Sequence, residues 1–387
     1  MTLASKPTHH TGNVPDTDAA ALIEQASALS RELREEHRRL NPAGVGAHVE
    51  LSSRLQNVRE RVDLIATDLG APDADVATGA SSLAGLRGEA RDLFGECFDV
   101  AVRPLVRGPD LGRGACEIAD VLLCSVAQRC GIQWPHFTSI GAADFFTSVS
   151  HIVRLAYPPS PIWNLAIAVH ELGHYCGPNW PGPEEKNPYE KFRVRVEVAN
   201  EHREELFADM FAVYTVGPAF VLACLARFNP VNRTLERKGL TKSPHPPDTQ
   251  RAAWILAGLD AVAGSSVGDS GAILRKVTNL AGERWNALCR ACREPRPGNL
   301  VALQDEAERL VSALRTSRPD AMYGDVRGAL ALRAAYPGLA AGAARPHPID
   351  VLNAAWFLRL DPEYADAAAL NGIERWGGNL IRGFTCP

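Results

Sequence analysis

The sequence lacks most features that would place the protein in a membrane, on nucleic acid or in a phosphate-transfer class. Its first residues contain no apolar segment of the kind found in secretory signals. The longest uncharged apolar run, Met210 to Ala226, falls short of a bilayer span and is interrupted at Gly217-Pro218. There is no glycine-rich phosphate loop, no GxSxG elbow and no basic aromatic patch. These absences predict a soluble protein with no stable membrane insertion and no nucleic-acid partner.

Neither charge nor cysteine content is strongly biased. The 387 residues carry a formal net charge of −4, and 46% of them are hydrophobic, as in ordinary soluble proteins. The nine cysteines are odd in number and scattered, which argues against a disulfide framework. We therefore expect reduced thiols and a cytoplasmic location. Cys289 and Cys292 have CxxC spacing without a second pair, which favours structural thiols over a metal or redox site.

Composition and hydrophobic spacing predict four parts of the chain. Residues 1–16 are polar and expected to be disordered. Residues 17–75 carry apolar residues at intervals of three and four around a break at 41–44, which predicts a coiled-coil-like helical hairpin. This hairpin would either cap the core or bind a protein partner. Residues 83–264 hold the candidate catalytic core, and residues 270–387 form a C-terminal helical region.

The expected fold is mainly α, an α+β chain with a small β-sheet. Two segments, residues 132–141 and 148–159, have the β-branched and aromatic content of short strands. A helix is predicted from Ser160-Pro161 to a glycine stop at Gly177. A longer helix is predicted from about Arg193 to Val216.

The predicted helix that ends at Gly177 contains the motif HELGH. His170 and His174 are four residues apart, so both imidazoles lie on one helix face and can bind a single ion. Glu171 lies about 100° around the helix, where it can reach a metal-bound water without binding the metal. Zn²⁺ is the expected cofactor, because it lowers the pKa of a bound water and leaves the carboxylate to take the proton.

A third ligand is expected from a second helix. The metzincin pattern would place a histidine where this chain has Trp180, and no Met-turn follows. In EELFADMF, Glu205 and Asp209 share a helical face, so Glu205 can bind the metal while Asp209 supports an imidazole N–H. His202, one turn earlier, is a competing ligand that lacks a partner at i+4.

HELGH followed by the Glu205–Asp209 segment resembles the gluzincin zinc peptidases, most nearly the HtpX and CAAX-prenyl-protease group. The segment SPHPPDTQR, which begins at Ser243, resembles the part of those proteins that follows the third ligand. The resemblance implies a zincin-like helical metallopeptidase core. It also implies that His245 assists the tetrahedral oxyanion and that Arg251 lies near the metal-binding carboxylate or the substrate backbone.

The resemblance spans roughly residues 149–259, and the chain departs from the membrane members because it lacks clear transmembrane helices. It also implies that residues 150–157 form an edge strand that pairs with an extended substrate. The expected function is hydrolysis of peptide bonds in a protein or peptide substrate. Two alternatives remain, an ImmA/IrrE-like regulatory peptidase and a non-catalytic zinc-stabilised coiled-coil interaction module. The presence of Glu171 argues against the second alternative.

Overall fold

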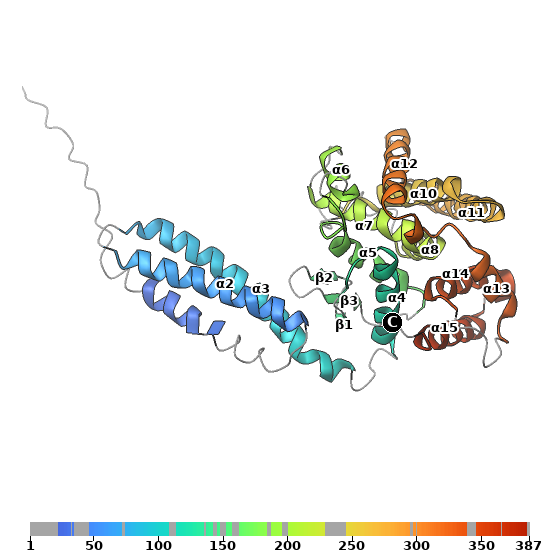
Figure 1. Ribbon diagram of the computed structural model, residues 1–387. Helices are drawn as coiled ribbons and strands as arrows, with labels where there is room; N and C mark the ends of the chain where they lie inside the picture. The colour runs from blue at the N-terminus through green and yellow to red at the C-terminus, as the bar shows by residue number, and fades with distance from the viewer. Residues whose placement is uncertain are drawn as a thin grey trace, which may run out of the picture. The chain divides into compact units, whose positions relative to one another are not determined.

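The chain divides into two compact units, Met1–Arg103 and Pro104–Pro387, which are described separately here (Figure 1). The computed structural model describes residues 22–31, 33–34, 46–71, 74–107, 114–134, 137–141, 145–147, 152–156, 162–183, 187–195, 200–228, 245–294, 297–298, 300–338, 346–364 and 366–384. The structure is mainly helical with one small sheet, as predicted. None of the helices in these ranges is long and apolar enough to cross a membrane.

The first unit consists of helices with one buried apolar face each. A helix over residues 22–31 precedes α2 (Gly46–Leu69) and α3 (Val76–Arg107), and α3 continues past the boundary between the units. Leu55, Val58 and Val62 recur at intervals of three and four along α2 and are fully buried. The break predicted at residues 41–44 lies outside the described residues.

The second unit contains most of the helices and the sheet. Its helices are α4 (Ala115–Arg129), α5 (Leu165–Cys176), α6 (Pro188–Arg195), α7 (Asn200–Val216), α8 (Pro218–Arg227), α10 (Asp248–Ser265), α11 (Asp269–Ala291), α12 (Leu300–Ser317), η3 (Pro319–Ala321), α13 (Arg327–Ala335), α14 (Pro348–Arg359), η4 (Pro362–Tyr364) and α15 (Ala367–Arg382). One continuous hydrophobic core joins them.

The sheet has three strands in the order β1-β3-β2. β1 (Phe137–Gly141) runs parallel to β3 (Ile152–Ala156), and β2 (Phe145–Thr147) runs antiparallel to it. The expectation that residues 150–157 form an edge strand is therefore wrong, because β3 is paired on both sides. β2 is an edge strand instead, and it packs against α5.

Helix boundaries differ from those predicted around the HELGH motif. The motif helix begins at Leu165 after Asn164, later than the predicted start at Ser160. It ends at Gly177 as predicted, but this glycine has φ −55° and is not in the left-handed region. Glycine is required there by packing, since a Cβ would lie 2.9 Å from the Tyr189 ring. The helix predicted from Arg193 to Val216 is two helices, α6 and α7.

The closest helix pair in the second unit is α5 and α7, which carry the candidate site. Gly173 of α5 faces Ala208 of α7, and a Cβ on Gly173 would lie 2.8 Å from the Ala208 Cα. The glycine of HELGH therefore lets the two backbones approach. At the end of α7, Gly217 has φ +69° and turns the chain directly into α8.

One expectation about the cysteines is wrong. Cys124 on α4 is disulfide-bonded, so the nine cysteines are not all reduced thiols. Cys289 and Cys292 are free cysteines, so they are not joined to each other by a disulfide.

Candidate metal centre

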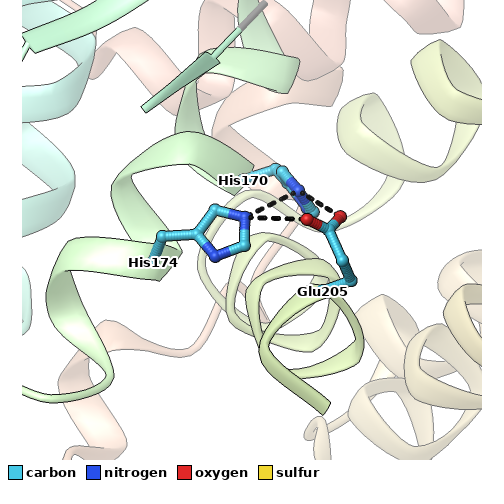
Figure 2. A group of neighbouring side chains, drawn as sticks. All are labelled: His170, His174 and Glu205. Carbon is cyan, nitrogen blue, oxygen red and sulfur yellow. Dashed lines mark hydrogen bonds and ion pairs between the residues drawn. The ribbon is translucent and has the colours of Figure 1, made fainter. Parts of the chain in front are cut away.

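His170, His174 and Glu205 converge on one point between α5 and α7 (Figure 2). The Nε2 atoms of the two histidines are 3.3 Å apart. Oε2 of Glu205 lies 3.2 Å from Nε2 of His170, and Oε1 lies 3.4 Å from Nε2 of His174. His174 and Glu205 are thirty-one residues apart in the sequence and lie on two different helices. The structure brings their side chains into direct contact.

These separations suit a tetrahedral zinc site. Two ligands of one tetrahedral zinc, each about 2.0–2.1 Å from the metal, lie about 3.3–3.4 Å from one another. The distance between the two Nε2 atoms matches that value, and each Nε2 atom lies within about 0.2 Å of it from a different oxygen of Glu205. When each residue offers one atom, the three donor atoms lie within 4.8 Å of one another. Oε2 of Glu205 is also buried and accepts no well-oriented hydrogen bond from the described residues, although Nδ1 of His245 lies 2.8 Å away. The donor set therefore fits a zinc ion in chemistry and in spacing.

A carboxylate on α7 supports the first histidine. Nδ1 of His170 lies 2.8 Å from Oδ1 of Asp209, whose side chain is fully buried. A proton on Nδ1 can be donated to this carboxylate, which leaves Nε2 with a free lone pair directed at the cluster. The short contact places Asp209 where it can favour the tautomer of His170 that a metal ligand needs, although Nδ1 makes no well-oriented hydrogen bond with a described residue.

Arg251 neutralises the buried carboxylate. Its Nε and Nη2 atoms donate to the two oxygens of Asp209 at 2.8 and 2.6 Å, a two-pronged contact. Nη2 is also 3.9 Å from Oε2 of Glu205. The face of the Phe228 ring lies under the guanidinium at 5.2 Å. Arg251 lies near the proposed metal-binding carboxylate, and through Asp209 it is linked to His170.

His245 reaches the cluster from the solvent side. Its Nδ1 is 2.8 Å from Oε2 of Glu205, while 46% of its side chain is exposed. By contrast, the side chains of His170 and Glu205 are only 5% and 13% exposed. The cluster therefore opens toward solvent on the side of His245 and His174.

The second residue of the motif, Glu171, is buried with 8% exposure and belongs to the same turn of α5 as His170. Its place in the helix puts its carboxylate about 100° around the axis from His170. This position keeps Glu171 apart from the three donor atoms that meet one another.

The electrostatic field around His170 favours a positive charge. Burial lowers the pKa of His170, but the Asp209 carboxylate outweighs burial and raises the pKa well above its usual value. Burial and the neighbouring His170 lower the pKa of His174 to about 4. Burial raises the pKa of Glu205, but contacts with His170 and His245 lower it by more. The net shift of this pKa is therefore downward. A site that holds a proton so firmly among carboxylates also favours a bound cation.

Sequence reasoning missed the residues that pack around the cluster. The Phe220 ring of α8 is stacked on the His170 imidazole, with centroids 6.3 Å apart and planes 8° from parallel. Nε1 of Trp254 donates to the Leu206 carbonyl at 2.7 Å, which ties α10 to the helix that carries Glu205. Gly173 had a visible signal, since a glycine inside an apolar helix usually marks a close contact. The contacts of Phe220 and Trp254 depend on how helices pack together, so the local sequence does not indicate them.

Comparisons with known proteins identify no relative of this chain. No family model, no curated protein and no solved structure matches it.

Proposed function

We propose that the protein is a zinc-dependent metallopeptidase that hydrolyses peptide bonds in a protein or peptide substrate. The observation that supports this most strongly is the meeting of the His170 and His174 Nε2 atoms, 3.3 Å apart, with the two carboxylate oxygens of Glu205, which lie 3.2 and 3.4 Å from one Nε2 atom each. These residues can supply three ligands of one zinc, and Glu171, which follows His170 in the motif, is a carboxylate suited to general base catalysis. A zincin-like core and the resemblance to gluzincins belong to this proposal.

His170, His174 and Glu205 would hold the zinc, and Asp209 and Arg251 would keep His170 in the correct tautomer. The bound zinc would polarise a water and the scissile carbonyl. Glu171 would take the proton from that water and deliver it to the leaving amine.

His245 is suited to the remaining charge that develops during hydrolysis. Its exposed side chain lies beside Glu205 at the open side of the cluster, where a substrate carbonyl can approach. An imidazole N–H at this position could donate to the developing oxyanion. Arg251 is too firmly bound to Asp209 to leave it, so its proposed role is to position His170 through Asp209 and to contribute a fixed positive charge.

The edge strand β2 supports an extended substrate. β2 packs against α5, and among the described strands it pairs only with β3, so its other edge could accept an added strand. A peptide that paired with this edge would run beside α5, the helix that carries His170 and His174. This assigns to β2 the role that the sequence had predicted for residues 150–157.

The first test is the zinc content of the purified protein, measured by elemental analysis. Wild-type protein and Glu204→Gln should hold about one zinc per chain, while Glu205→Gln should lose it, because a neutral amide is a poor zinc ligand. Glu204 is the matched control, since it is the preceding residue and its side chain is exposed. Wild-type protein without zinc after purification in zinc-containing buffer would overturn the metal site.

The second test separates an enzyme from a non-catalytic zinc module. Glu171→Gln should retain zinc and lose about 10²–10⁴-fold in cleavage of an unstructured protein substrate, since a general base contributes that much. Equal cleavage rates for wild type and Glu171→Gln would contradict the mechanism. Stoichiometric zinc without any cleavage in wild-type protein would favour the non-catalytic module.

A further inference from the structure

A second charged cavity lies away from the metal cluster, at the N-terminal end of α5. Its volume is about 450 Å³, within the range of small-molecule sites. It lies between the start of α5, the ends of α8 and α14, and the start of α15. The residues that carry the argument are Trp163, Asn164, Arg227, Trp356 and Arg359.

Arg359 is the distinctive group in this cavity. Its Cζ lies over the rings of Trp163 and Trp356, at 4.7 and 4.9 Å from their centroids. No described residue accepts a hydrogen bond from the guanidinium or forms an ion pair with it. Partial burial lowers the pKa of Arg359, and no neighbouring carboxylate raises it. The two indoles hold the guanidinium plane in place while its N–H donors remain available.

The described lining of the cavity contains basic and no acidic side chains. Arg227 also lines the cavity, where it is engaged in an interaction of its own. Asn164 is the N-cap of α5, and its side chain does not cap the first turn. The positive end of the helix dipole therefore faces this region without a compensating side chain. The nearest carboxylate along α15, Asp366, is engaged as the cap of that helix through the Ala369 N–H.

We infer that this cavity is a binding site for a small phosphate-bearing molecule. The Arg359 guanidinium and a helix N-terminus favour an anion, and the fork of Arg359 can bind two phosphate oxygens. The indole faces and the cavity volume leave room for an organic group on the phosphate. The site lies about one and a half helical turns before His170 along α5, so it is distinct from the metal cluster.

The test is calorimetric titration of the full-length protein at constant ionic strength. The probes are inorganic phosphate and glycerol 3-phosphate, with acetate and glycerol as controls. Both phosphate probes should bind, and acetate and glycerol should not. Tighter binding of the ester would identify phosphate esters as the ligand class, whereas equal binding would identify free phosphate. Absence of phosphate binding up to about 20 mM, or equal binding of acetate, would overturn the proposal.

Variants locate the binding in this cavity. Arg359→Gln should weaken phosphate binding by about tenfold or more, because it removes a charged two-pronged contact. Arg359→Lys should be intermediate, since it keeps the charge and loses the fork. Asn164→Asp is nearly isosteric and places a carboxylate in the cavity wall, so it should also abolish binding. It keeps the test valid if Arg359→Gln fails to fold.

The matched control is Arg193→Gln, which removes one exposed positive charge from α6, away from the cavity lining. It should bind phosphate as wild type does. A dissociation constant that is unchanged in both Arg359→Gln and Asn164→Asp would refute this site.

Discussion

Two groups of basic side chains in the second unit have pKa values shifted in opposite directions, one group beside α7 and the other at the ends of α14. On α5 and α10, His170 and Arg251 both contact the Asp209 carboxylate, and both have raised pKa values although burial alone would lower them. At the two ends of α14, His347 and Arg359 have lowered pKa values, because burial acts on them without a carboxylate to offset it. The difference separates the proposed cation site from a region that favours neutral groups or anions.

The comparison matters for function because carboxylates are in excess of Arg251 at one place, whereas a positive charge lacks a described partner at the other. Around His170 the carboxylates of Asp209 and Glu205 outnumber what Arg251 can neutralise, which suits a bound metal. Around Arg359 the positive charge has no partner among the described residues, which suits an anionic ligand. Each imbalance costs stability unless a ligand is bound, and such costs are typical of functional sites.

The largest effect is expected from Arg251→Met. This change keeps most of the side-chain volume and leaves the fully buried Asp209 carboxylate with only His170 as a partner. Breaking a buried ion pair from one side typically costs about 3–5 kcal/mol of unfolding free energy. Urea unfolding of the metal-free protein measures it.

The matched control for Arg251→Met is Arg195→Met. Arg195 is 39% exposed and pairs with Glu306 between α6 and α12, so its loss should cost about 0–1 kcal/mol. Equal losses of unfolding free energy in the two variants would show that the buried Arg251–Asp209 pair stabilises the protein no more than the exposed Arg195–Glu306 pair.

Gly173→Ala should give the next largest effect, since it pushes apart the two helices that carry the ligands. The new Cβ would lie 2.8 Å from the Ala208 Cα, which is backbone and cannot rotate away. We expect a loss of about 1–3 kcal/mol and weaker zinc binding, measured by urea unfolding and by competition with a chelator. Gly264→Ala on α10 meets no atom within 4 Å and should instead stabilise the protein slightly. Unimpaired zinc binding in Gly173→Ala would contradict the role of this close approach.

His347 allows a test by pH on the α14 side. Nδ1 of His347 accepts from the Ile349 N–H and caps α14, while Nε2 lies 3.0 Å from the Ser125 hydroxyl. Burial and the nearby Arg129 lower its pKa to about 4, from an unfolded value near 6.5. The unfolded chain therefore binds the proton first, so the stabilising effect of this cap is complete above pH 6.5 and is lost as the pH falls through 4.

The measurement is the free energy of unfolding of wild type and His347→Asn at pH 7.5 and pH 4. Asparagine caps a helix without titrating, so the variant should lose about 0.5–2 kcal/mol less than wild type over this interval. Parallel pH profiles of the two proteins would show that the stabilising effect of the His347 cap does not depend on a neutral imidazole.

The metal cluster was more predictable from the sequence than the rest of the second unit, and the reason is local. His170 with His174, and Glu205 with Asp209, are each four residues apart on one helix, and helical geometry alone places each pair on a common face. The docking of α5 on α7 was inferred from the need for a third ligand, and the resemblance to gluzincins agreed with it. The small sheet was predictable in type from residues 137–141 and 152–156, but β2 was not, because three residues are too few to show a pattern.

The Arg359 cavity was not predictable from the sequence. Trp163 and Arg359 are far apart in the chain and meet only because α14 packs in the same core as the start of α5. Nothing in the local spacing of either residue signals this contact. Helix boundaries failed for a related reason, since the sequence signals at Ser160 and Pro161 resemble a helix start but the helix begins at Leu165.

The smallest loss of unfolding free energy is expected from Arg359→Gln. This small loss would distinguish Arg359 from Arg251, whose removal breaks a buried ion pair. Arg359 contributes a contact with two indole faces and no ion pair among the described residues, so its removal should cost about 0.5–1 kcal/mol of unfolding free energy. Thermal unfolding with and without 20 mM phosphate, about the upper limit of the titration, separates stability from binding. Wild type should be stabilised by phosphate and Arg359→Gln should not. A loss as large as that of Arg251→Met would mean that Arg359 is a structural residue, whereas a small loss with an abolished phosphate response assigns its donors to a ligand.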